Sequence, residues 1–172
     1  LGPVTILVNN AGVTDFTPLE EITDELWDFV YAINVRGPMI MAQAVLPDMK
    51  AAHWGRIVNI SSSSAQTGAV NMITYSSSKG AVVTMTRSMA QEFGPPGITV
   101  NKIPPGSVMN TIMSEANRDR FQIPTEVLLQ TVPVRRLGEP EDIANACAWL
   151  CHEASGYVTG QTIGVNGGRV VT

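Results

Sequence analysis

Short runs rich in β-branched residues alternate with long helical stretches along this chain of 172 residues. Four such runs are predicted as strands, at residues 5–8, 56–60, 98–103 and 162–165. They show little alternation of polar and apolar residues, as expected for strands covered on both faces. Strands of this kind separated by helices predict an α/β fold around a largely parallel sheet, and the length predicts a single domain over residues 1–172.

The stretch between the first two strands is predicted to be a long helix. Thr17-Pro18-Leu19-Glu20 has the spacing of a capping box with proline at the first helical position, and Thr23-Asp24-Glu25 strengthens this start. Pro38 has no N–H to donate to the Asn34 carbonyl, so this carbonyl has no partner within the helix. The proline either causes only an incidental kink, or it leaves the carbonyl free to hold an ordered water. The face expected to be apolar and buried comprises Leu26, Phe29, Val30, Ile33, Gly37, Ile40 and Ala44.

A further helix is predicted over residues 74–93, where small or apolar side chains occur nearly all round. Such a helix must pack on the sheet with one side and on another surface with the other, for example on a second copy of the chain. Residues 107–135 are polar and mixed, with a helical piece near 125–131, and we expect a mobile substrate-loop insertion over the strand ends. Pro140 is expected to begin the last helix.

Composition and charge exclude several classes of function. Charged residues make up 15% of the chain, against a typical share of about 25%, so a folded core is expected rather than disorder. The net charge of −4 leaves no basic surface for a nucleic acid or an anionic membrane. No apolar run approaches the ~18 residues of a membrane span, and the first residues do not resemble a signal peptide. We therefore expect a cytoplasmic protein without nucleic-acid or membrane partners.

The cysteines do not indicate a metal site. Cys147 and Cys151 share one helical face with Ile143, Ala146 and Leu150, which predicts that both thiols lie on the buried side of the last helix. The two histidines lie near predicted helix ends in polar surroundings. Because no set of cysteine and histidine completes a tetrahedral site, we expect no bound metal.

Tyr75 and Lys79 are the residues with the clearest chemical potential. Their spacing of four places a phenol and an ammonium on one face near the start of a helix. A nearby cation favours the phenolate and lowers the pKa of a tyrosine from about 10, which suits a general acid and base. Such a pair alone is common on helix surfaces. Ser62, however, follows a strand end, where open α/β sheets bind ligands, and it could hydrogen-bond the same substrate oxygen.

With these residues the chain resembles the short-chain dehydrogenases/reductases, and among them the 3-oxoacyl-[acyl-carrier-protein] reductases. The resemblance implies a Rossmann-like doubly wound parallel sheet, of which this chain is the C-terminal portion with strands 4–7 and its first strand at an edge. The motifs run through the whole chain: Asn9-Asn10-Ala11-Gly12, Asn34 in Ile33-Asn34-Val35-Arg36-Gly37, Ser62 in Asn59-Ile60-Ser61-Ser62, Tyr75 with Lys79, Pro105-Gly106, Tyr157-Val158-Thr159-Gly160-Gln161 and Val165-Asn166-Gly167-Gly168.

The resemblance also implies an oxidoreductase that interconverts a small carbonyl compound and a secondary alcohol with NAD or NADP, as a homodimer or homotetramer. Tyr75 would exchange a proton with the substrate oxygen, and Lys79 would lower the tyrosine pKa and bind the nicotinamide ribose. Ser62 would orient the carbonyl, and Asn34 would hold a water of the proton relay. The implied cofactor contacts are Asn10, Ala11, Gly12, Ile60, Tyr75, Lys79, Pro105, Gly106 and Val108.

The chain departs from the family pattern at several places. Asn110 stands where the family's Pro-Gly-x-x-x-Thr has its threonine, Thr111 follows one place later, and Lys102 and Thr5 replace residues that are usually small and acidic. The chain contains no Thr-Gly-x-x-x-Gly-x-Gly loop, which in the family holds the pyrophosphate and precedes the residue that selects NAD or NADP. A non-catalytic segment that serves assembly is therefore a second hypothesis, and a dehydratase or epimerase on the same fold is a third.

Overall fold

The computed structural model describes residues 2–117 and 124–171. Three strands, β1 (Ile6–Asn9), β2 (Gly55–Ile60) and β3 (Ile98–Ile103), form a parallel sheet in the order β1-β2-β3. In the register, Ile6 lies beside Arg56 and Gly55 lies beside Ile98. The predicted α/β fold with its first strand at an edge of the sheet is confirmed.

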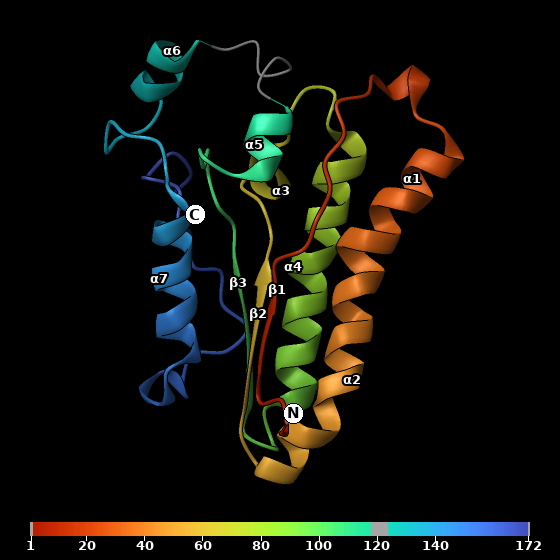
Figure 1. Cartoon of the computed structure of the whole chain (residues 1–172), viewed down its shortest axis with the longest axis vertical. Helices are drawn as coiled ribbons and strands as arrows, with labels where there is room; N and C mark the ends of the chain where they lie inside the picture. The colour runs from red at the N-terminus through yellow and green to blue at the C-terminus, as the bar shows by residue number, and fades with distance from the viewer. Residues whose placement is uncertain (1, 118–123, 172) are drawn as a thin grey trace.

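Helices cover both faces of this sheet (Figure 1). On one face lie α2 (Gly37–Ala52) and α4 (Ile73–Phe93), and α7 (Pro140–Cys151) lies on the other. Two apolar clusters fill the spaces between the layers: Leu7, Ala42, Val45, Met49, Ile57, Ala90, Phe93, Ile98 and Val100 on the α2–α4 side, and Val58, Ile103 and Leu150 on the α7 side. Burial on both faces explains why β2 and β3 lack polar alternation. The edge strand β1 differs from this expectation, because Leu7 is buried while Ile6 and Val8 are exposed.

The predicted fourth strand at residues 162–165 does not form. This segment runs beside β3 but makes only two isolated parallel bridges, Lys102 with Thr162 and Pro105 with Val165. Lys102 donates its N–H to the Gln161 carbonyl and accepts from the Ile163 N–H, as a ladder requires. The next donor along β3 would be Pro104, which has no N–H, so the ladder is interrupted there.

The first long helix begins later than predicted. Leu19–Glu21 forms a short 3-10 turn (η1), and α1 (Asp24–Tyr31) begins after Thr23, whose hydroxyl accepts the Leu26 N–H at 3.2 Å. Thr17 does not cap a helix, since its N–H bonds the Asn71 carbonyl in another loop. The helix therefore begins at the second predicted start, Thr23-Asp24-Glu25, and not at Thr17.

A π-helical turn, η2 (Ala32–Arg36), joins α1 to α2. It holds one residue more than an α-turn over a similar rise, which shifts the buried face of the helix that follows. The fully buried residues of this run are Val30, Asn34, Pro38, Ala42, Val45 and Met49. Phe29, Ile40 and Ala44, predicted to be buried, are exposed. For Ile40 and Ala44, which follow the turn, the reason is that a constant 3.6-residue period does not hold across it.

Residues Asp24–Ala52 form one helical run of 29 residues with a mean hydropathy of 1.3 in its most apolar window. By length and composition alone this run could cross a membrane, so the prediction that no stretch comes close is wrong. A single such helix is weak evidence, because core helices of soluble proteins meet the same criterion. Here Ala42, Val45 and Met49 pack on the sheet.

The remaining elements, apart from α7, are short. They are α3 (Ser64–Thr67), α5 (Ile112–Ala116), α6 (Thr125–Gln130) and the 3-10 turn η4 (Glu153–Ser155). The helical piece expected near 125–131 is confirmed as α6, whereas α5 was not predicted. Within the predicted insertion at 107–135, residues 118–123 lie outside the described residues. Its mobility stays a prediction.

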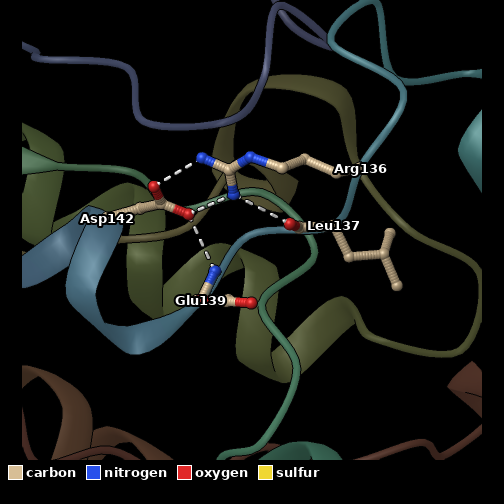
Figure 2. Close-up of polar contacts among 4 residues, drawn as sticks. All are labelled: Arg136, Leu137, Glu139 and Asp142. Atoms are coloured by element: carbon tan, nitrogen blue, oxygen red, sulfur yellow. Dashed lines mark hydrogen bonds and ion pairs between the residues drawn. The ribbon is translucent and has the colours of Figure 1, made fainter.

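An ion pair fixes the start of α7, where Pro140 occupies the first helical position as predicted. The Asp142 carboxylate accepts from both terminal nitrogens of Arg136, at 2.6 and 2.7 Å, and also from the Glu139 N–H at 2.8 Å (Figure 2). The Arg136 guanidinium holds the pKa of Asp142 well below its usual range. Cys147 and Cys151 pack against the apolar cluster of α7, which confirms their predicted face.

Candidate active site

The predicted site residues meet at the carboxyl end of the sheet, where parallel α/β sheets bind ligands. The loop after β2 is tied to the end of β3, because Ser61 donates its N–H to the Ile103 carbonyl at 2.8 Å and Ser63 donates to the Pro105 carbonyl at 3.0 Å. Residues 10–14 continue from β1 toward α4 and η2. All three strand ends thus contribute to one region.

Tyr75 and Lys79 lie side by side in the first turns of α4, and both side chains are buried. The Lys79 Nζ lies 5.8 Å from the centroid of the Tyr75 ring. It donates a hydrogen bond to the Ile60 carbonyl, the last of β2, at 2.9 Å. This bond points the ammonium toward the strand ends rather than toward solvent.

Burial governs the protonation of both groups. It raises the pKa of the Tyr75 phenol, and the nearby Ser62 hydroxyl opposes this rise by favouring the phenolate. Burial is thus the larger influence on Tyr75 in this structure, and the lowering of its pKa expected from Lys79, whose Nζ lies 5.8 Å from the ring centroid, stays a prediction. Burial also lowers the pKa of Lys79 to about 8.

Ser62 lies at the end of a short serine network. Its Oγ is 2.9 Å from the Ser64 Oγ, and it accepts the Ser64 N–H at 3.1 Å. These contacts hold the Ser62 hydroxyl just before α3, close enough to the Tyr75 phenol to influence its pKa. Its half-buried position leaves it open to a ligand.

Asn34 clamps the loop after β1 onto α4. Its Oδ1 accepts the Val13 N–H at 2.9 Å, and its Nδ2 donates to the Val13 carbonyl at 2.9 Å and to the Ser78 Oγ at 3.0 Å. The Ser78 hydroxyl in turn donates to the Tyr75 carbonyl at 2.7 Å. Asn34 lies within the π turn, a feature common at functional sites, and its place in a water relay stays a prediction.

The predicted cofactor contacts fall into two groups. Gly12 lies against Asn34 and Lys79, since a Cβ there would be 3.2 Å from both the Asn34 Oδ1 and the Lys79 Nζ. Asn10 and Ala11 precede it at the surface. Of the predicted cofactor contacts, Gly12 and the Ile60 carbonyl are thus the ones that lie against the Lys79 ammonium.

The second group follows β3. Gly106 donates its N–H to the Val165 carbonyl at 3.1 Å, and Pro105 is joined to the serine loop through Ser63. Val108 pairs with Gly138 instead of with the residues around Lys79. Thr111, the displaced threonine of the Pro-Gly motif, caps α5 by accepting the Ser114 N–H at 3.0 Å.

Several residues of the site were missed by the sequence reasoning. Ser61 donates its hydroxyl to the Lys79 carbonyl at 3.2 Å, Ser78 joins Asn34 to α4, and Asp15 accepts the Tyr75 N–H at 3.2 Å. Ser78 shares the helical face of Tyr75, which is a signal the sequence offers. In the described residues, no group of three or more His, Cys, Asp or Glu side chains could hold a metal ion.

Comparison with known proteins agrees with this site. Residues 1–169 match the family model described as enoyl-(acyl carrier protein) reductase. The acetoacetyl-CoA reductase of Rhizobium meliloti (strain 1021) is 40% identical over 169 residues, which are 98% of this chain and 69% of that protein. The 3-oxoacyl-[acyl-carrier-protein] reductase of Aquifex aeolicus is 36% identical over 168 residues, covering 96% and 65%.

Among solved structures, a protein of Agrobacterium tumefaciens assigned as a gluconate dehydrogenase superposes with a TM-score of 0.91 and 32% identity. The match covers 97% of this chain and 65% of that one. An α/β sheet with a buried tyrosine–lysine pair at its strand ends places the molecule among the Rossmann-like oxidoreductases. The chain belongs to the short-chain dehydrogenase/reductase family, and it spans about two-thirds of the length of these relatives.

Proposed function

We propose that the protein carrying this chain interconverts a carbonyl compound and a secondary alcohol with NAD or NADP, and that 3-oxoacyl thioesters are its substrate class. The observation that carries the proposal is the buried Tyr75–Lys79 pair at the strand ends, with Lys79 bonded to the Ile60 carbonyl at 2.9 Å. The names of the two reductases similar to this chain support the thioester substrate.

In the reducing direction, the Tyr75 hydroxyl gives its proton to the substrate oxygen as that oxygen gains negative charge. Tyr75 holds its proton before the transfer, because a phenol with an ordinary pKa of about 10 is neutral at pH 7 and burial also favours the neutral form. Ser62 donates to the same oxygen and orients the carbonyl. Lys79 stabilises the phenolate that remains. A nicotinamide held by these residues would supply the hydride that the carbonyl carbon accepts.

The residues around Lys79 fit the ribose of such a cofactor. Lys79 is a buried donor with two further protons beyond its bond to Ile60, and Gly12 leaves room beside it that a Cβ would fill. We propose that Lys79, Tyr75 and Gly12 hold the ribose, while Asn10, Ala11, Pro105, Gly106 and Val108 contact the rest of the cofactor.

The test is Tyr75→Phe in the full-length protein, assayed with acetoacetyl-CoA and either reduced cofactor. Loss of general acid catalysis predicts a fall in kcat of about 10²–10⁴-fold. The cofactor Kd should stay within threefold, because only the transferable proton is removed. Lys79→Ala should both lower kcat and weaken cofactor binding. Tyr157→Phe is the matched control, since Tyr157 is fully exposed. A Tyr75→Phe variant that keeps most of its kcat would refute the mechanism.

We further propose that the protein assembles as a homodimer or homotetramer through the α1–α2 run and α4. This side exposes Trp27, Phe29, Ile40 and Met41, and Met39 lines a shallow groove of about 470 Å³. Exposed apolar patches of this kind commonly mark protein interfaces. Met39→Lys should reduce the assembly in sedimentation velocity, whereas Val70→Lys, also on an exposed residue, should not. Equal sedimentation of the wild type and the two variants would contradict this interface.

The same surface favours the second hypothesis, an assembly role without catalysis for these 172 residues by themselves. The absence of a glycine-rich phosphate loop from the sequence supports it. The two hypotheses separate in one assay of the 172-residue chain by itself: turnover that depends on Tyr75 requires the first, whereas no turnover beside an active full-length protein favours the second. The acidic charge and the similarity to acyl-thioester reductases support a cytoplasmic location.

A further inference from the structure

Asp15 is a buried acid in the loop that follows β1, and its contact lies in the first turn of α4. Its side chain is 6% exposed, and its Oδ1 accepts the backbone N–H of Tyr75 at 3.2 Å across 60 positions of sequence. Because α4 begins at Ile73, the Tyr75 N–H has no acceptor within the helix. The bond therefore satisfies a group that the helix itself leaves open.

No residue next to α4 in sequence performs this task. The residue before the helix, Met72, makes no side-chain capping bond. A carboxylate at this end of a helix is also favoured by the helix dipole. Asp15 thus caps α4 from another part of the chain and joins the loop after β1 to the residue proposed as the proton donor.

The cap carries an evident cost in stability. The second carboxylate oxygen, Oδ2, is buried without a hydrogen-bond partner, and so are the hydroxyls of Thr74 and Ser76, the two neighbours of Tyr75 in the sequence. Of the five such atoms in the described residues, three lie in this group. Burial raises the pKa of Asp15 although two backbone N–H groups stabilise its ionised form. Unpaired buried polar groups concentrate at functional sites, where another constraint retains them.

The loop that carries Asp15 is held at a second point. Asn34 bonds both backbone groups of Val13, and Gly12 lies against Lys79. Between these contacts, residues 12–15 connect Lys79, Asn34 and Tyr75 through one short segment. A shift of the first turn of α4 would change the place of Tyr75 relative to Ser62 and Lys79.

We propose that Asp15 is a positioning residue for the reaction, because its carboxylate oxygen fixes the first turn of α4 and with it the place of the Tyr75 phenol. The proposal rests on the function proposed above. Asp15 itself touches no reacting atom. Its effect is expected in kcat, since misplacement of a proton donor by a small distance lowers the rate without removing a binding contact.

The test compares Asp15→Ala, Asp15→Asn and Asp48→Ala in the full-length protein. Asparagine keeps an acceptor oxygen for the Tyr75 N–H, whereas alanine has none. Asp48 is the matched control, because its Oδ2 also accepts a backbone N–H, that of Val4 at 2.9 Å, just before the amino end of β1. We measure kcat, substrate KM and cofactor Kd on the folded protein.

Asp15→Ala should lower kcat at least fivefold and leave the cofactor Kd within twofold, while Asp15→Asn should lie nearer to the wild type than to Asp15→Ala. A smaller fall in kcat, or an asparagine variant as poor as alanine, would overturn the role. If Asp15→Ala does not fold, Asp15→Ser replaces it with the same expectations, since its hydroxyl is too short to reach the same point. Tyr75→Phe is assayed in parallel: full activity there refutes the proposed function, and its loss beside an active Asp15→Ala refutes the Asp15 role alone.

Discussion

Replacing Asn34 by alanine removes three hydrogen bonds that join the loop after β1 to α4. Two of them satisfy the N–H and the carbonyl of Val13, and the third reaches the Ser78 hydroxyl. The Asn34 side chain is 1% exposed, so its amide has exchanged hydration for these partners. The substitution removes the amide but keeps these three partner groups, which then lack its hydrogen bonds.

The size of the effect follows from what is left unpaired. A buried donor or acceptor without its partner costs about 1–3 kcal/mol. Val13 is only partly buried, so water recovers some of this loss, and Ser78 keeps its bond to the Tyr75 carbonyl. We therefore expect the free energy of unfolding to fall by about 2–4 kcal/mol, near the upper part of the range for single substitutions.

Urea unfolding of the full-length protein, followed by far-UV circular dichroism at fixed concentration, measures this change. Asn101→Ala is the matched control: Asn101 is equally buried and clamps two backbone groups, the Val158 carbonyl at 2.7 Å and the Gln161 N–H at 3.0 Å. Both variants should lose similar stability, but only Asn34→Ala should reduce kcat severalfold. A loss below 1 kcal/mol for Asn34→Ala, or an equal loss of kcat in both, would refute the reasoning.

Three further predictions concern other parts of the chain. Burial lowers the pKa of Lys102 to about 8, so the unfolded chain binds more protons between pH 8 and 10 and stability rises with pH there; Lys102→Met should raise the urea midpoint at pH 7, with a gain that shrinks toward pH 10, and a constant gain would contradict this. Gly97 has φ +79°, and a Cβ would lie 2.4 Å from the His53 carbonyl oxygen, so Gly97→Ala should lower the unfolding free energy by about 2 kcal/mol or more; an unchanged midpoint would count against it. The 172-residue chain by itself should bind NADH and NADPH more weakly than ~10 μM in fluorescence titrations, and tighter saturable binding would show that the glycine-rich loop is dispensable.

The sequence predicts the sheet and the reactive pair because both depend on local spacing. Three apolar runs become β1, β2 and β3, and the interval of four between Tyr75 and Lys79 places them on one face wherever the helix lies. The predicted fourth strand fails at Pro104, a residue visible in the sequence, but its effect falls on the partner segment, whose own residues give no sign of it.

The rest of the site depends on contacts that the sequence pattern does not contain. The bonds of Asn34 to Val13 and of Asp15 to Tyr75 cross 21 and 60 positions, and neither pair forms a motif. The direction of the Tyr75 pKa likewise depends on how much protein surrounds the phenol, whereas the spacing to Lys79 reports only the nearby charge. Burial and long-range pairing are therefore visible only in the folded structure.

The π turn at Ala32–Arg36 also limits how this helix can change its length during evolution. Deleting one residue there would restore ordinary α-geometry, but it would rotate one half of the helix by about 100° relative to the other. Asn34 would leave its position beside Ser78, or Met49 and Val45 would turn away from the sheet while exposed side chains turned inward. We expect related sequences to vary freely at the exposed positions of this helix while keeping its residue count between Val30 and Met49 unchanged.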